Sequence, residues 1–140
     1  MALKIKLVAH TPGVEAMVAT SMLTTTSGSL PSRIHDRLVD SPEKVGEIVS
    51  RLEVQHGNVL EHNRLIWVVE ATGDEVLEAM LDTRFLHFTR LGDDRWLMSG
   101  NLRTVVEYAQ SKGSAFTREL AGSVRDLAPM VHMFMRRGHT

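Results

Sequence analysis

The sequence contains no cysteine, which excludes disulfide bonds and zinc sites built from thiolates. A chain without cysteine fits a reducing compartment, and we expect this protein in the cytoplasm. No apolar run approaches the ~18–20 residues that a membrane-spanning helix needs. The segment MALKIKLVAH also lacks the long apolar region and cleavage site of a signal peptide. Neither secretion nor a membrane partner is therefore predicted.

An excess of charge of one sign is lacking as well. The chain has 16 Lys and Arg residues against 17 Asp and Glu residues, a formal net charge of −1 with His neutral. Nucleic-acid-binding domains carry a basic excess or stripe, so this balance argues against a nucleic-acid partner. The seven histidines include no pair four residues apart beside a glutamate, the pattern of a helical zinc site. No metal site is predicted.

The composition that remains is typical of a folded domain. The chain has 140 residues, of which 43% are hydrophobic and 24% charged. A domain of this length buries about 68–70% of its unfolded surface, and the chain is too short for two ordinary domains. We expect residues 1–140 to form one domain that ends in a disordered tail at residues 136–140.

The segment from His56 to Glu70 organises the predicted fold. Gly57 and Asn58 interrupt any helix before them, and the chain becomes almost wholly apolar from Leu65 to Val69. Branched and aromatic side chains in such a run favour a β-strand. Because successive residues are apolar, the pattern predicts a central strand that is covered on both faces.

Apolar periodicity predicts helices over much of the remaining chain, beside a half-buried edge strand at residues 4–9. Each helix has a start or stop signal in the sequence. The signals are Thr11-Pro12, Ser41-Pro42, a capping box of Thr72 and Glu75, Asn101, and Pro129, which should kink or split a last helix over 116–136. Together these elements predict an α+β fold, a helix-rich single domain with a small sheet.

Two apolar stripes occupy the second half of the chain. The first contains Leu77, Leu81, Phe85 and Phe88, which continue the spacing of a helix up to a turn at residues 92–94, and the second runs from Phe116 to Phe134. Both stripes compete for one small sheet. We therefore expect one stripe to be buried against a second copy of the chain, as a homodimer or homotetramer.

Two short segments resemble motifs of the flavin-dependent thymidylate synthases, the ThyX family. His56 begins an H-x-x-x-L-E-H pattern before the apolar strand, and residues 99–103 (SGNLR) resemble the S-G-N-x-R segment that opens a late helix in that family. The resemblance covers most of the chain as an order of elements, but its specific matches lie in these two segments. It implies a homo-oligomer with FAD as cofactor. In members with an intact signature, it also implies methylation of dUMP by methylenetetrahydrofolate and NADPH.

The resemblance also implies roles for individual residues. His56 and Asn58 would lie at the flavin, and Asn101 and Arg103 would be cofactor contacts, in agreement with the anion preference of a helix start. Lys112 takes the place of an arginine that faces the pyrimidine. The alternative is structural: Gly57 and Asn58 end a helix beside His56, Asn101 caps a helix and Arg103 is solvated. For the adjacent Glu61 and His62 we favour a structural role, since successive strand residues point to opposite faces.

The signature of the family, R-H-R followed by a serine after seven intervening residues, is degenerate in this chain. Asp82-Thr83-Arg84 takes the place of R-H-R, and Gly92 takes the place of the serine. Of the signature itself only Arg84 remains, as a further cofactor-binding residue, and Arg90 is the neighbouring cation that would compensate at the substrate. Each lost charge-assisted hydrogen bond removes ~1.5–3 kcal/mol of binding free energy. No catalytic residue is predicted.

Three functional interpretations follow from the sequence. The first is a ThyX-like protein without ordinary thymidylate synthase activity that keeps a weak pocket for FAD or another phosphate-bearing molecule. In this interpretation Arg84, Asn101, Arg103 and Lys112 converge on one cleft. The second is a non-enzymatic structural or interaction protein that forms homo-oligomers. The third is an active FAD-dependent enzyme with a site rebuilt from Arg84, Arg90 and Lys112.

Overall fold

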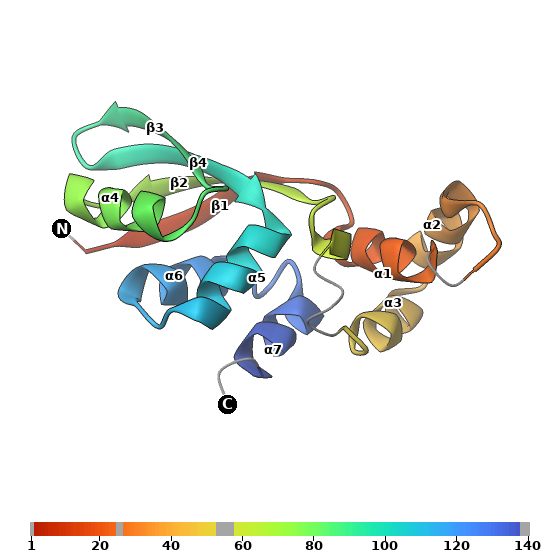
Figure 1. Cartoon of the computed structure of the whole chain (residues 1–140). Helices are drawn as coiled ribbons and strands as arrows, with labels where there is room; N and C mark the ends of the chain where they lie inside the picture. Colours follow the sequence, from red (N-terminus) through yellow and green to blue (C-terminus); the bar gives the residue numbers. More distant parts are fainter. Residues whose placement is uncertain (1, 25–26, 53–57, 138–140) are drawn as a thin grey trace.

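An antiparallel four-stranded sheet in the order β1-β2-β4-β3 forms one layer of the fold (Figure 1). Its strands are β1 (Lys4–His10), β2 (Arg64–Glu70), β3 (His87–Gly92) and β4 (Arg95–Asn101). The structure is a computed structural model that describes residues 2–24, 27–52 and 58–137. As predicted, the first strand lies at an edge of the sheet and the apolar strand lies in its centre.

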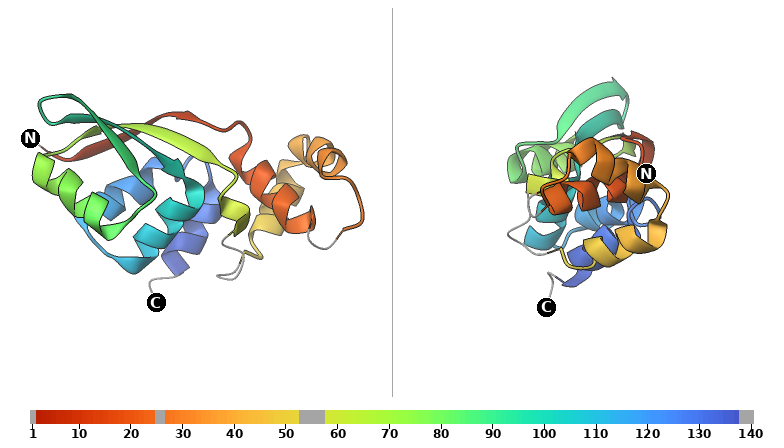
Figure 2. Two further views of the ribbon diagram at one scale, coloured as in Figure 1. Left: turned by 45° about the horizontal axis from the view of Figure 1, so that its top comes forward. Right: turned by 90° about the vertical axis from the view of Figure 1, so that its right-hand side faces the viewer.

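Seven helices in the described part of the chain complete the fold, and the predicted α+β class with a small sheet is confirmed. They are α1 (Val14–Thr24), α2 (Pro31–Val39), α3 (Pro42–Val49), α4 (Gly73–Asp82), α5 (Leu102–Ser111), α6 (Ala115–Ser123) and α7 (Pro129–Arg137). Figures 1 and 2 show α5, α6 and α7 on one side of the sheet, while α1, α2 and α3 gather beyond one end of it.

The core lies between the sheet and α5 and α6. Leu65, Trp67 and Val69 alternate along β2 on the face toward these helices and are fully buried. The Trp67 indole N–H donates a hydrogen bond of 2.9 Å to the Ser123 hydroxyl at the end of α6. Ile66, on the opposite face, is 37% exposed. The prediction of a strand covered on both faces is therefore wrong, because the helices cover only one face of the sheet.

The apolar stripe that was predicted to continue as a helix is divided between two kinds of element. Helix α4 ends at Asp82, and Thr83 after it has extended backbone angles. Phe88 lies in β3, opposite Met98 of β4. Pairing with β4 outweighs the helical spacing here, because a hairpin satisfies the backbone groups of both strands. The predicted turn at residues 92–94 connects the two strands, with Asp94 at a φ of 52°.

The helix-start predictions had different outcomes. Thr72 and Glu75 form the predicted capping box of α4, and Pro129 begins α7 and so separates it from α6. Thr11, in contrast, does not cap a helix, because α1 begins only at Val14. Its hydroxyl oxygen instead accepts a hydrogen bond of 2.9 Å from the Arg64 N–H at the start of β2.

Two predictions concern residues at the margins of the described ranges. The disordered tail was placed at residues 136–140, but α7 extends through Arg137, and residues 138–140 lie outside the described ranges. His56, the predicted flavin contact, lies outside them too. Among the helices that the structure describes, none is long and apolar enough to cross a bilayer.

Candidate functional site

The start of α5 lines a cavity of about 500 Å³. Its lining residues come from the turn before β2, the segment before β3, and the first turns of α5. They are Glu61, Phe85, Asn101, Arg103, Thr104 and Glu107. Two residues of the S-G-N-x-R motif, Asn101 and Arg103, therefore line one cavity, and both are predicted cofactor-binding residues.

Within this motif, Gly100 and Asn101 have identifiable structural roles. A Cβ atom at Gly100 would lie 3.1 Å from the Phe85 carbonyl oxygen and 2.9 Å from a Leu86 methyl carbon, so a side chain there would collide with the neighbouring segment. The Asn101 side-chain oxygen accepts a hydrogen bond of 2.8 Å from the Thr104 N–H and caps α5. The structural interpretation accounts for both residues.

Arg103 is held between two carboxylates. It donates to Glu107 over 2.8 Å through Nε and to Glu61 through a terminal nitrogen. Hydrogen bonds to Glu107 first and Glu61 second raise the pKa of the Arg103 guanidinium. One cation and two anions among the lining residues leave the cavity with a formal charge of −1 (1 − 2), which disfavours a phosphate.

Lys112 is similarly engaged at the other end of α5. Its ammonium donates to Glu78 over 2.6 Å and to Asp82 over 2.7 Å, both carboxylates of α4. Asp82 also accepts a hydrogen bond of 2.9 Å from the Tyr108 hydroxyl. The bonds from Lys112 and Tyr108 lower the pKa of Asp82, while burial and the bond to Asp82 raise the pKa of Tyr108. The Asp82 carboxylate therefore neutralises Lys112, the cation that was predicted to face a substrate.

The remaining predicted residues lie at separate places in the fold. Arg84 is an exposed residue between α4 and β3. Arg90 is at the β3–β4 hairpin, where its guanidinium lies 5.8 Å from the Trp96 ring centroid and 3.6 Å from an Asp93 carboxylate oxygen. Asn58 lines a different cavity of about 380 Å³ together with His62. Glu61 and His62 line different cavities, and both lie in the turn before β2, so the alternation of strand residues does not apply to them.

The structure does not bring the predicted cations together within one chain. Asn101 and Lys112 flank the 10 residues of α5, a span of about 15 Å at the rise of an α-helix. Among the predicted site residues that the structure describes, Asn101 and Arg103 line the same cavity. For FAD, this cavity offers an exposed aromatic ring, Phe85, against which a flavin could stack, but its single guanidinium is already paired. The residues fit a planar ring and do not fit a diphosphate.

Sequence reasoning missed Tyr108 and Asn63. Tyr108 is the only tyrosine of the chain and lies on the apolar face of α5. A buried tyrosine hydroxyl usually has a hydrogen-bond partner, so this position indicated a polar residue packed against α5. Asn63 gave no signal, because an asparagine before a strand is ordinary turn chemistry. It is fully buried, and within the described residues neither polar atom of its side chain has a hydrogen-bond partner.

No model of a known protein family matches this sequence, and no curated protein matches it. In the described residues, no group of three His, Asp or Glu side chains could hold a metal ion. The comparison with the flavin-dependent thymidylate synthases therefore depends on the motifs themselves.

Proposed function

We propose that this protein keeps the framework of the flavin-dependent thymidylate synthases and does not methylate dUMP. The arrangement around Asp82 carries the proposal. Asp82 stands in place of the first signature arginine and binds Lys112, the residue in place of the pyrimidine-facing arginine. A carboxylate and an ammonium that neutralise each other do not provide the positive field that a nucleotide phosphate needs. The absence of cysteine fits a cytoplasmic location for such a protein.

The order of elements supports the family part of the proposal. The S-G-N segment ends β4, and α5 begins at the next residue, Leu102, as the resemblance implies. A synthase rebuilt from Arg84, Arg90 and Lys112 has no comparable support. Arg90 lies at the β3–β4 hairpin and Lys112 binds the carboxylates of α4.

The activity part is tested by an assay of dTMP formation. The purified protein is incubated with dUMP, methylenetetrahydrofolate, NADPH and FAD, beside an intact flavin-dependent synthase as positive control. We expect no dTMP above background, because the phosphate-binding cations are paired with carboxylates. Turnover comparable with the control enzyme would refute the proposal.

The cavity at the start of α5 supports weak binding of a flavin or nucleotide through its ring. Phe85 is 59% exposed at this cavity and can stack against a planar ring, a contact worth about 1–3 kcal/mol per base in other proteins. Since Arg103 is paired, the diphosphate of FAD should add little affinity. Riboflavin, which has the same ring and no phosphate, should bind about as tightly as FAD in a calorimetric titration.

Variants make this test specific to the cavity. Phe85→Ala should weaken the binding of both flavins, whereas Leu91→Ala, at an exposed position on β3 outside the cavity lining, should leave it unchanged. Replacing Glu61 and Glu107 with Gln should free Arg103 to bind the diphosphate of FAD. The affinity for FAD, but not for riboflavin, should then rise by about tenfold or more, since a charge-assisted hydrogen bond contributes ~1.5–3 kcal/mol. If neither flavin binds below millimolar concentration, the cavity is not a flavin site.

A second candidate function, an interaction protein that assembles with itself, is favoured by the surface of α4. Leu77, Met80 and Leu81 form an exposed apolar face on this helix, with Phe85 beyond its end; we call these four residues the α4 face. The other predicted stripe is largely buried in the core, including Phe116, Leu120, Val131 and Phe134. An uncovered apolar face of this kind is typical of a protein–protein contact.

A further inference from the structure

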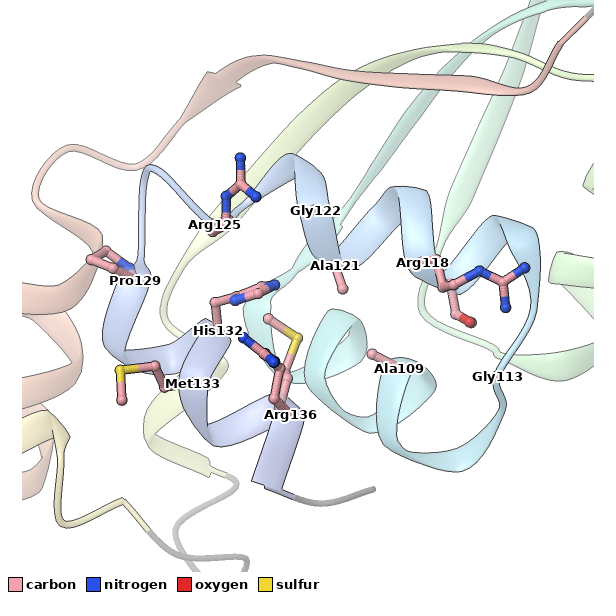
Figure 3. Close-up of a pocket in the computed structure, with 12 residues that line it drawn as sticks. Ala109, Gly113, Arg118, Ala121, Gly122, Arg125, Pro129, His132, Met133 and Arg136 are labelled. Carbon is pink, nitrogen blue, oxygen red and sulfur yellow. The ribbon is translucent and has the colours of Figure 1, made fainter. Parts of the chain in front are cut away.

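A groove of about 520 Å³ lies among α5, α6 and α7, apart from the cavity at the start of α5 (Figure 3). Its volume is within the range of about 300–1,000 Å³ that small-molecule sites occupy. Much of its lining is small or apolar. These lining residues are Ala109, Gly113, Ala121, Gly122, Pro129, Met133 and Met135.

All ionisable residues that line the groove are basic. They are Arg118, Arg125, His132 and Arg136. Within the described residues no carboxylate belongs to the lining, and the nearby Asp126 makes only a 3.6 Å ion pair with Arg125 between mostly exposed side chains. Such a pair contributes little, so the positive field of the groove is largely uncompensated.

The environment of His132 reports this positive field. Burial lowers the pKa of His132, and the charges of Arg125 and Arg136 lower it further. In Figure 3 the imidazole points from α7 toward α6, on the side of Ala121. A negative group in the groove would therefore meet His132 and Arg136 beside an apolar surface.

We propose that this groove binds a small amphiphilic anion, with an apolar chain against the small and methionine side chains and a carboxylate or phosphate beside His132 and Arg136. Two observations carry the assignment: a groove lined mostly by small and apolar side chains, and a rim of basic lining residues with no carboxylate among the described lining residues. Apolar contact provides affinity, and the charged rim selects for the anionic head. The site is independent of the proposed flavin cavity.

Octanoate is the probe, titrated calorimetrically into the full-length protein, with 1-octanol and inorganic phosphate as matched ligands. Octanoate should bind with one molecule per chain. Octanol has the chain without the charge and phosphate has the charge without the chain, so each should bind at least tenfold more weakly. Equal affinities for octanoate and octanol would overturn the proposal, because the basic rim would then have no role.

Two pairs of variants place the binding in the groove. Gly122 lines the groove, and a Cβ added there would meet no atom within 4 Å, so Gly122→Leu should fill the groove without disturbing the fold. It should abolish octanoate binding. Gly46→Leu in α3 is the control, since Gly46 has equally open surroundings elsewhere and its variant should bind octanoate unchanged.

Arg136→Gln tests the rim in the same way. It should weaken the binding of octanoate at least tenfold and leave the binding of octanol unchanged. Arg95→Gln on β4 should alter the affinity for neither ligand. Octanoate binding that survives both Gly122→Leu and Arg136→Gln would exclude the groove as its site. If the protein bound phosphatidylglycerol vesicles but not octanoate, its ligand would be a membrane surface and not a free anion. That result would overturn the assignment.

Discussion

Asn63 lies directly before β2, where it is fully buried. Its carboxamide oxygen and nitrogen have no hydrogen-bond partner within the described residues. A buried polar group without a partner costs about 1–3 kcal/mol of folding free energy. Replacing it with an apolar side chain of similar size should remove that cost.

We therefore expect Asn63→Leu to raise the free energy of unfolding by about 1–3 kcal/mol, measured by urea denaturation. Asn101→Leu is the matched control, because the Asn101 side chain caps α5 and its loss should lower stability by about 1 kcal/mol. A loss of stability in both variants would mean that Asn63 has a polar partner in solution.

Glu15 gives a prediction of pH dependence. Its carboxylate accepts a 2.9 Å hydrogen bond from the Val131 N–H in the first turn of α7, and burial nevertheless raises its pKa above 4.5. A raised pKa means that the folded protein holds the proton more tightly than the unfolded chain. This contribution to stability is present below the unfolded pKa and is lost as pH rises through the folded pKa.

Glu15→Gln keeps a side-chain oxygen for the Val131 N–H and removes the ionisation. The free energy of unfolding of the variant, relative to that of the parent, should therefore increase as pH rises from about 4 to 7. Urea unfolding at several pH values measures this difference. A difference that stays constant over the range would show that burial does not perturb Glu15.

At the scale of the element, the clearest successes of sequence reasoning are local signals. The capping box of Thr72 and Glu75 was predicted because both partners lie within one helical turn, and the structure contains both of its hydrogen bonds. The hairpin of β3 and β4 was missed because Phe88 continues a helical spacing. Its strand partner Met98 lies ten residues away, and local periodicity does not reveal such pairing.

The α4 capping box can be compared with a helix start that lacks a side-chain cap. Thr72→Ala should lower the free energy of unfolding by about 1 kcal/mol, since it leaves the Glu75 N–H without its acceptor. Ser41 has the same position before α3, but its side chain makes no capping hydrogen bond. Ser41→Ala should therefore change stability by only a few tenths of a kcal/mol. Equal effects in thermal or urea unfolding would contradict this assignment.

At the scale of the whole molecule, the site was less predictable than the fold. Asn101 and Arg103 were found because the motif places them in one helical turn. Glu107, four residues from Arg103 on the same helix, is a local partner. The other neutralising partners come from distant segments, since Glu61 is 42 residues from Arg103 and Asp82 is 30 residues from Lys112. A sequence pattern gives the type of residue but not its long-range partner. The charge of the site therefore depends on tertiary contacts.

The α4 face leads to the last prediction, that the protein forms a homodimer or homotetramer. Leu77, Met80 and Leu81 are each more than half exposed, with Leu81 at 79% and the nearby Phe85 at 59%. Burying apolar area stabilises an interface by roughly 25 cal/mol per Å², and a two-fold contact would cover this face with its own copy. Sedimentation equilibrium at micromolar concentration should therefore give a multiple of the 15.6 kDa chain mass.

Leu81→Lys tests whether the α4 face makes this contact. The position is already in solvent within one chain, so the substitution should not unfold the domain, but it places two like charges in a two-fold interface. We expect the variant to sediment as a monomer that remains folded, with the circular dichroism spectrum of the parent and a lower melting temperature, because subunit association no longer stabilises the fold. Leu91→Lys is the control, since Leu91 is 52% exposed on the β3–β4 hairpin and outside this face. A monomeric parent protein would refute self-association, and a variant that remains oligomeric would place the interface elsewhere on the molecule.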